Sequence, residues 1–218
     1  MKIALYTVNI GNYDERIVAP EIPGVDLYMI TDDEEEVQVP GWRMKSPMVL
    51  SDTARKTSRH PKINSHLYFP DYDYTIYIDS NMFINRHPKF FIEEFLGEHD
   101  IALHKNPYRS CAYDEAKEIR DVLKYEDPDV VDQQVAHMRF NGYPEHNGLG
   151  ACHLLVRRNT PQISKLNEHW WSMVAQFSYR DQLSFNYSCY KTNNKYKVIE
   201  PYKKYTVQQN HKKKKVTF

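Results

Sequence analysis

An acid and an amide stand two residues apart, directly after a strongly hydrophobic segment. The segment Tyr74–Ile78 is rich in β-branched and aromatic residues, which predicts a buried strand, and Asp79, Ser80 and Asn81 follow it. Oxygen atoms of Asp and Asn suit Mg²⁺ or Mn²⁺, ions that usually bridge protein carboxylates and substrate phosphates. A metal at Asp79 and Asn81 would neutralise a diphosphate leaving group. The alternative is a turn that only closes the strand, because all three residues are turn formers.

A second group of candidate residues is basic and precedes that strand. Arg55, Arg59 and Lys62 are spaced by four and then three residues, so they share one helical face if Pro61 does not turn Lys62 away. Arginine pairs with phosphate through two parallel hydrogen bonds, which predicts a nucleotide-binding role. The alternative is a basic face that water solvates.

Two further residues could take part in chemistry. Asp181 stands at the start of a predicted helix, whose N-terminus stabilises a negative charge. It could act as a general base if an acceptor hydroxyl lies beside it, and the alternative is a helix cap. His211 is a candidate metal ligand, and the alternative is a surface histidine.

Short strands and helices alternate along the chain. Strands are predicted over Ile3–Val8, Val25–Ile30, Tyr74–Ile78, Asp100–His104, Gly150–Val156 and Val198–Ile199. Helices are predicted over 52–60 (capped by Ser51 and interrupted by Pro61), 61–68, 88–96, 112–125, 129–140, 160–176 and 181–190. This alternation predicts one α/β domain over residues 1–200, with a mostly parallel sheet and helices on both faces. A lysine-rich tail, 201–218, follows as a lid or linker.

The elements explain why the candidate residues should meet. Ligands of such sheets bind at the carboxyl ends of the strands. Polar residues cluster where predicted strands stop, at Asn9, Asp32 and Asp79. We therefore expect one site at that edge of the sheet.

Composition narrows the partners and the compartment. The 29 basic and 29 acidic residues cancel, so no overall charge attracts the chain to nucleic acid or to an anionic membrane. The 3 cysteines form no C-x-x-C pair, which is typical of a reducing compartment. No segment resembles a signal peptide or a membrane-spanning helix, so a cytoplasmic location is expected.

Five stretches of the chain carry a family resemblance. They are ALYTVNIGNYD, LYMITD, SDTARKTSRHPKINSHLYFPDYDYTIYIDSN, GYPEHNGLGACHLLVRRNT and YRDQLSF. Together they resemble the GT-A glycosyltransferases, and more narrowly a glycosyltransferase-like family of plants, bacteria and large algal viruses. The resemblance covers about residues 1–200, and the third stretch is its most specific part. It implies a Rossmann-like GT-A fold, and host cytoplasm if the chain is viral.

The resemblance also implies roles for individual residues. The nucleotide-sugar donor would be held by Thr7, Asn9, Asp32, Arg55, Arg59, Asp79 and Ser80. The metal, Mn²⁺ or Mg²⁺, would be held by Asp79, Asn81 and His211. The acceptor would be contacted by His146, Asn147 and Gln182, with Asp181 as the catalytic residue. Asn81 departs from the Asp-x-Asp motif of the family, and a neutral ligand implies weaker metal binding.

The implied activity is transfer of a hexose or deoxyhexose from a nucleotide-diphosphate sugar, with UDP favoured, to a glycan or protein-linked acceptor. Asp181 as base would invert the anomeric carbon, whereas a retaining transferase needs no such base. A non-catalytic glycan-binding module is the alternative from another class, because the 17 tyrosines suit sugar-facing surfaces. A nucleotidyltransferase is disfavoured, because the loop after the first strand is not the Gly-rich basic loop that holds a triphosphate.

Overall fold

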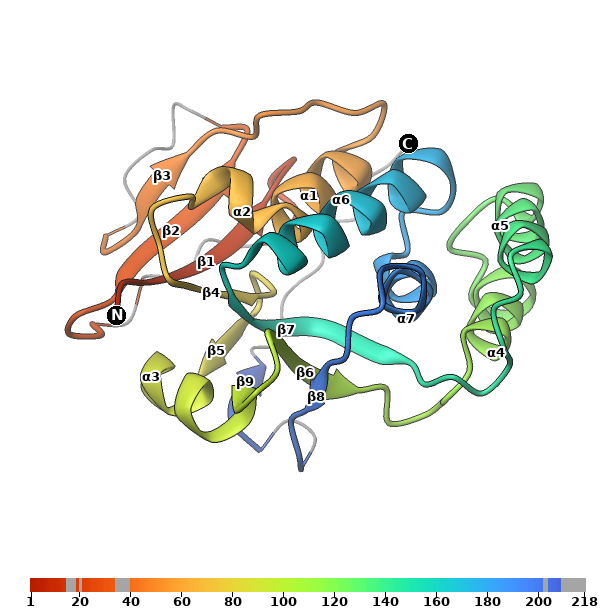
Figure 1. Ribbon diagram of the computed structural model, residues 1–218. Coiled ribbons are helices and arrows are strands. Elements are labelled where there is room, and N and C mark those ends of the chain that lie inside the picture. The colour runs from red at the N-terminus through yellow and green to blue at the C-terminus, as the bar shows by residue number, and fades with distance from the viewer. Residues whose placement is uncertain (15–18, 20, 34–39, 202–203, 209–218) are drawn as a thin grey trace.

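The computed structural model describes residues 1–14, 19, 21–33, 40–201 and 204–208. Its centre is a seven-stranded sheet with the strand order β3-β2-β1-β4-β7-β6-β8 (Figure 1). The strands are β1 (Ile3–Asn9), β2 (Asp26–Thr31), β3 (Arg43–Lys45), β4 (Tyr74–Ile78), β6 (Ile101–Lys105), β7 (Gly150–Arg158) and β8 (Lys197–Val198). β7 runs antiparallel to its neighbours β4 and β6, and the other pairs are parallel. The predicted α/β sheet, mostly parallel, is confirmed.

Helices cover both faces of this sheet (Figure 1). One face carries α1 (Ala54–Ile63), α2 (Ser65–Tyr68) and α6 (Pro161–Gln176), and the other carries α3 (Pro88–Phe91) with the π-helical segment η1 (Ile92–Leu96). Beyond the sheet edge, α4 (Ala112–Lys117), the π-helical segment η2 (Glu118–Leu123) and α5 (Pro128–Phe140) pack beside α7 (Asp181–Thr192). The largest buried side chain, Trp170, lies in the core between α6 and the sheet. No described helix has both the length and the apolar character needed to cross a bilayer.

A second, two-stranded sheet joins distant parts of the chain. β5 (Met82–Ile84) begins directly after Asn81 and pairs antiparallel with β9 (Thr206–Gln208). Met82 is the partner of Gln208, so the described end of the chain lies beside the Asp-Ser-Asn segment. These two strands, and β3, are too short to be predicted from the hydrophobic pattern.

Two predicted details of the first helix are wrong. Thr53, not Ser51, caps α1: its backbone is extended and its hydroxyl accepts from the Lys56 N–H at 3.2 Å. Ser51 instead donates its N–H to the Thr57 hydroxyl at 2.9 Å. Pro61 lies inside α1 and does not end it, so the helix continues to Ile63.

The end of α1 is held by two buried side chains, which explains why the helix passes Pro61. The Arg157 guanidinium, 0% exposed, donates to the carbonyls of Ile63 at 2.8 Å and Lys62 at 2.9 Å. The Tyr6 hydroxyl donates to the Lys62 carbonyl at 2.9 Å and also contacts Arg157. The last carbonyls of a helix have no partner within it. Tyr6 and Arg157, which lie on strands of the sheet, therefore provide hydrogen-bond donors to the last carbonyls of α1. These bonds also fix the position of Lys62.

Candidate active site

The site is built around the carboxyl end of β4. Asp79 follows this strand, and its side chain is 39% exposed. Its Oδ1 accepts from the Tyr77 hydroxyl at 2.8 Å and lies 3.4 Å from the Lys62 Nζ. Asn81 is half-buried two residues on. One carboxylate oxygen of Asp79 is thus oriented by the protein, while the group as a whole remains open to a ligand.

Lys62 connects the two acids of the site. Its ammonium lies 2.7 Å from the Asp181 Oδ2 and 3.4 Å from the Asp79 Oδ1, and its side chain is 4% exposed. It also lies over the ring of Tyr77, 4.9 Å from the centroid. The sequence places Lys62 on the basic face of a helix, but its role as the link between two acids was missed.

The predicted basic face is present, and it points at the segment that precedes α7. The Arg55 guanidinium donates to the Tyr179 hydroxyl at 2.8 Å. The Arg59 Nε donates to the Tyr179 carbonyl at 3.2 Å and lies 3.8 Å from the Asp181 Oδ2. Burial, the largest single effect, lowers the pKa of Arg59, but the charge of Asp181, together with Tyr77, Asp79 and Tyr179, raises it more, and the net shift is upward. Arg55, Arg59 and Lys62 therefore form one positive surface beside the two acids.

Asp181 is buried and ionised. It is the first residue of α7, after Arg180 at the capping position, and it is 5% exposed. Burial alone raises the pKa of its carboxyl group, but Lys62 and Arg59 lower it more, so the net pKa is below the ordinary value. Its Oδ1 accepts from the N–H of Gln182 at 3.1 Å. The residue that the sequence offers as a general base thus begins in an ion pair.

The ends of β1 and β2 lie at the same edge of the sheet. Asn9 holds Asp14 by two hydrogen bonds, from its Nδ2 to the Asp14 carbonyl at 2.9 Å and from the Asp14 N–H to its Oδ1 at 3.2 Å. The Asp14 carboxylate accepts from the Ser80 hydroxyl. Asp32 accepts the N–H of Gly11 at 2.9 Å. The loop after β1 thus joins Asn9, Asp32 and Ser80. Asp14, which belongs to this loop, was not predicted as a site residue.

Thr7 also lies in this region, within β1 and close to its carboxyl end. Its side chain is 2% exposed, and its hydroxyl has no hydrogen-bond partner among the described residues. A buried hydroxyl without a partner is costly, so the described part of the protein alone leaves Thr7 unsatisfied.

The predicted acceptor residues do not form one group. Gln182 follows Asp181 in α7, and the Asn147 carbonyl accepts from Asn186 of the same helix at 3.2 Å. His146 instead contacts Cys111 at the start of α4, where its N–H donates to the Sγ at 3.3 Å. His211 lies outside the described residues.

Two glycines at the start of β7 allow a close approach of the backbone to neighbouring side chains. Gly148 has a φ of +82°, and a side chain there would meet the Tyr196 hydroxyl at 2.7 Å. A Cβ on Gly150 would lie 2.7 Å from a methyl group of Leu103 and 2.8 Å from the Phe185 ring. This segment is therefore a close backbone approach, and it has no phosphate-binding geometry.

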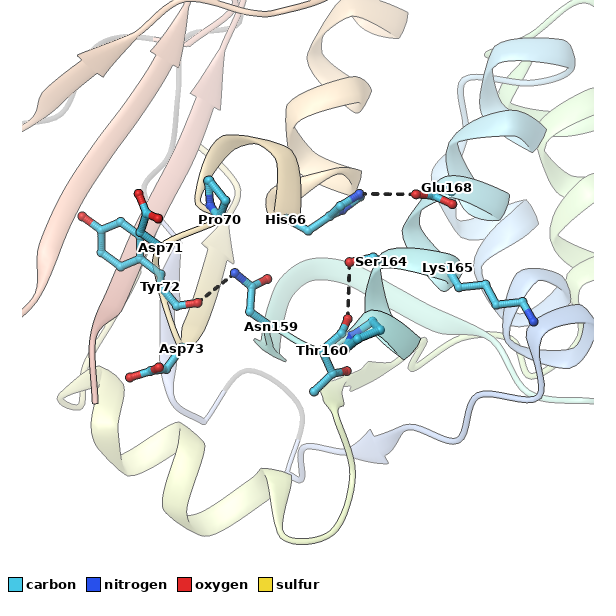
Figure 2. A pocket seen from close by; sticks show the side chains of 11 residues that line it. His66, Pro70, Asp71, Tyr72, Asp73, Asn159, Thr160, Ser164, Lys165 and Glu168 are labelled. Carbon is cyan, nitrogen blue, oxygen red and sulfur yellow. Dashed lines mark hydrogen bonds and ion pairs between the residues drawn. The ribbon is translucent and has the colours of Figure 1, made fainter.

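A cavity of about 670 Å³ lies at the other end of the sheet. Figure 2 shows the side chains that line it. Tyr72 and Asp73, which precede β4, line it together with Asn159 and Thr160, which follow β7. Its polar walls include His66, whose ring lies 3.9 Å from Glu168. Because Asp79 lies at the opposite end of β4, this cavity is separate from the candidate active site.

The residues at the candidate site fit a divalent metal of the hard class. Asp79 offers a partly exposed carboxylate and Asn81 an amide oxygen, and Mg²⁺ and Mn²⁺ prefer such oxygen ligands. No metal-binding group of His, Cys, Asp and Glu is found at this place among the described residues. A metal here would therefore depend on the amide, on substrate phosphates and on water.

Comparison with known proteins identifies the family. A model of the TOD1/MUCI70 glycosyltransferase-like domain matches residues 29–214 of the chain. The chain belongs to the TOD1/MUCI70 glycosyltransferase-like family. The match includes Asp32, the basic face of α1, the Asp-Ser-Asn segment and Asp181. A comparison with curated protein sequences finds no match.

Solved structures place the TOD1/MUCI70 chain among the GT-A glycosyltransferases by fold. It resembles the bifunctional glycosyltransferase WbbM in its apo form, with a TM-score of 0.51 and 9% identity over 91% of this chain. It also resembles mouse xyloside xylosyltransferase 1 in its apo form, with a TM-score of 0.51 and 11% identity over 91% of this chain. The chain spans 38% of WbbM and 85% of the mouse enzyme. The predicted GT-A architecture is confirmed.

Proposed function

We propose that this chain transfers a sugar from a nucleotide-diphosphate sugar, preferably a UDP-sugar, to a glycan or protein-linked acceptor. The observation that carries this proposal is the meeting of Asp79, Lys62 and Asp181 at the carboxyl end of β4. A partly exposed carboxylate beside a basic helix face suits a diphosphate and its counter-ion. The family and the fold support the reaction class.

On the donor side, each group has a physical task. Arg55 and Arg59 would bind the nucleotide through their guanidinium groups, which match phosphate oxygens. Thr7 offers a buried hydroxyl that lacks a protein partner. Asn9, Asp32 and Ser80 order the loop after β1, through their bonds to Asp14 and Gly11. We assign base and ribose recognition to that loop.

Asp79 and Asn81 would hold Mn²⁺ or Mg²⁺, and the ion would neutralise charge on the departing diphosphate. His211 stays in this ligand set. His211 follows β9, which ends at Gln208 opposite Met82, and it lies outside the described residues.

On the acceptor side, Asp181 would accept the proton of the attacking hydroxyl, and Gln182 and Asn147 would orient the acceptor. His146 precedes Asn147 and would act through their shared loop. This assignment requires the Asp181 carboxylate to leave Lys62 when substrates bind. Its lowered pKa keeps it ionised, and therefore able to accept a proton, at neutral pH.

A retaining transferase is the alternative within the same class. In a retaining transferase, Asp181 would keep Lys62 in place, and a group other than Asp181 would accept the proton of the acceptor hydroxyl. The anomeric configuration of the product separates the two, because a base-assisted single displacement inverts it. Retention of configuration would remove Asp181 from the role of base and leave the donor site intact.

The experiment that tests the function is a binding panel of UDP, GDP and their sugars, each with and without Mn²⁺, on wild type and Asp79→Ala. A ligand that binds only the folded state raises the apparent melting temperature. We expect stabilisation by one nucleotide that requires Mn²⁺ and is absent in Asp79→Ala. Asp71→Ala is a matched control, because Asp71 is exposed and lies before β4. No response to any nucleotide would favour a glycan-binding module.

A further inference from the structure

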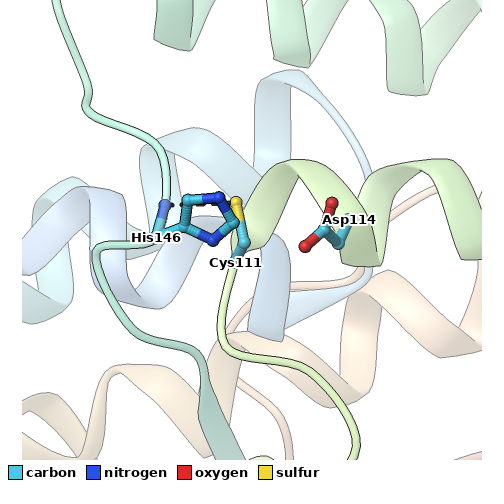
Figure 3. Close-up of side chains that lie close together, drawn as sticks. All are labelled: Cys111, Asp114 and His146. Carbon is cyan, nitrogen blue, oxygen red and sulfur yellow. Dashed lines mark hydrogen bonds between the residues drawn. The ribbon is translucent and has the colours of Figure 1, made fainter.

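A second group of metal-ligating side chains lies away from the candidate active site. Cys111 precedes α4, Asp114 lies in its first turn, and His146 lies in the loop that leads to β7. Figure 3 shows the three side chains together at the start of α4. One ligand atom from each lies within 4.8 Å of those of the others. None of the three residues belongs to the proposed donor site.

We propose that Cys111, Asp114 and His146 bind one transition-metal ion of the zinc class. Thiolate, imidazole and carboxylate are the three donor types that Zn²⁺ takes in proteins, and a thiolate disfavours Mg²⁺ and Mn²⁺. In a tetrahedral zinc site, ligand atoms lie about 3.3–3.8 Å apart, from bond lengths of about 2.0–2.3 Å. The present limit of 4.8 Å needs a closure of about 1 Å. Asp114 and His146 are exposed and can rotate to provide it.

The surroundings leave these three groups available. Arg120 is paired with Asp121 and Asp132, and Arg139 is paired with Glu145 at 2.9 Å. Within the described part of the chain, no basic side chain forms an ion pair with Asp114. The two arginines that line the cavity at this group are therefore already compensated by acids other than the proposed ligands, and Lys117, which also lines it, is exposed.

Space for a fourth ligand is present. The three residues line a cavity of about 270 Å³ between α4, α5 and the loop that carries His146. A water molecule occupies about 30 Å³ in the liquid, so one fits beside the ion. The Cys111 Sγ already accepts the His146 N–H at 3.3 Å, and a metal-bound thiolate would accept it more strongly. Binding displaces the proton of the Cys111 thiol to solvent.

His146 lies in a loop that contacts α4 through Cys111. Its φ is +57°, a left-handed conformation in which histidine is enriched among non-glycine residues. A bound ion would clip the loop 141–149 to α4, and that loop also carries Asn147.

The test uses Co²⁺ as the probe, in the Asp79→Ala background so that the predicted donor-site metal does not contribute. A cobalt–thiolate bond gives an ultraviolet charge-transfer band. We expect one equivalent of Co²⁺ to produce this band, and Zn²⁺ to displace it. Cys111→Ser should abolish the band. Asp114→Asn and His146→Gln should each weaken Co²⁺ binding at least about tenfold.

Asp129→Asn is the matched control, because Asp129 is an exposed acid in the first turn of another helix, α5. It should leave the titration unchanged. Asp114 and His146 are exposed, so their variants test the site even if Cys111→Ser does not fold. A wild-type chain without the band would overturn the site, and so would a band that neither Asp114→Asn nor His146→Gln weakens. Because the readout involves no nucleotide, its failure is distinct from failure of the glycosyltransferase assignment.

Discussion

The Lys62 ammonium and the Asp181 carboxylate lie 2.7 Å apart, with side chains 4% and 7% exposed. They are separated by more than half of the chain, so this ion pair joins α1 to α7. Removing one member of such a pair strands a buried charge, which is more costly than losing the attraction alone. The pair is therefore the first place at which to test both the stability and the chemistry of the site.

Lys62→Met is expected to lower the free energy of unfolding by about 3–5 kcal/mol at pH 7. Asp181 has a lowered pKa in the folded state, so its contribution is present above the unfolded pKa and is lost as the pH falls through the folded value. The deficit of the variant should therefore shrink on going from pH 7 to about pH 3. Urea unfolding at both pH values measures it.

Lys56→Met is the control for this change, because Lys56 lies on the same helix and is only half-buried. It should alter stability by less than about 1 kcal/mol. The double variant Lys62→Met with Asp181→Leu should recover part of the loss, since no buried charge remains. A deficit that is equal at both pH values would mean that Lys62 contributes packing and not an ion pair.

Arg157→Leu is expected to destabilise the fold by at least about 2 kcal/mol, because the carbonyls of Lys62 and Ile63 lose their donor. It should also weaken nucleotide binding, since Lys62 is held by that carbonyl bond. The neighbouring Arg158→Leu is the matched control: its side chain is 39% exposed and pairs with Asp100 at the surface. Thermal melts with and without nucleotide give both quantities, and equal effects of the two variants would contradict this account.

Asn81→Asp is expected to tighten Mn²⁺ binding by about tenfold in the presence of nucleotide, because a charged ligand replaces a neutral one. Free Mn²⁺, measured by electron paramagnetic resonance, gives the affinity directly. Asn85→Asp is the control, since Asn85 is exposed and lies beyond the intervening strand β5. If both variants tighten binding equally, the effect is general electrostatics and Asn81 is not a ligand.

Gly150→Ala is expected to cost about 1–3 kcal/mol through overpacking. The added methyl group would meet Leu103 and Phe185, both fully buried, at under 3 Å. Gly24→Ala is the comparison, because a side chain there meets no atom within 4 Å and only its positive φ opposes it. Denaturant midpoints at one pH suffice. A smaller loss for Gly150→Ala than for Gly24→Ala would show that the core relaxes around the methyl group.

The strands and helices that carry long hydrophobic patterns could be predicted from the sequence. β4 was predicted over its observed bounds, because five β-branched or aromatic residues stand between clear turn formers. β3 and β5 could not be predicted, since each has three residues and depends on a partner strand supplied elsewhere. The partner of β5 lies more than a hundred residues away, in a segment whose lysine-rich sequence predicts a lid or linker and no strand.

In the candidate site, too, the residue types could be predicted from the local sequence, whereas contacts between distant elements could not. The acids and basic residues could be chosen by type and spacing, and the rule for the carboxyl ends of strands placed Asn9, Asp32 and Asp79 at one edge. The contact of Lys62 with Asp181 depends on how α1 and α7 pack, which no local pattern encodes. The end of α1 was mispredicted for a related reason: Pro61 disfavours a helix locally, but Arg157 and Tyr6 supply its carbonyl partners from the sheet.

The reversed direction of β7 divides the linear chain into two contiguous blocks. Every segment that reaches the carboxyl edge through parallel strands β1, β2 and β4 belongs to residues 1–81, whereas β7 brings the loop before it to that edge from residues 141–150. A replacement confined to the loop 141–149 would therefore alter one part of that edge and leave the segments carried by β1, β2 and β4 unchanged. A crossover between Met82 and Asp181 would instead separate β5 from its partner β9 and Lys62 from Asp181.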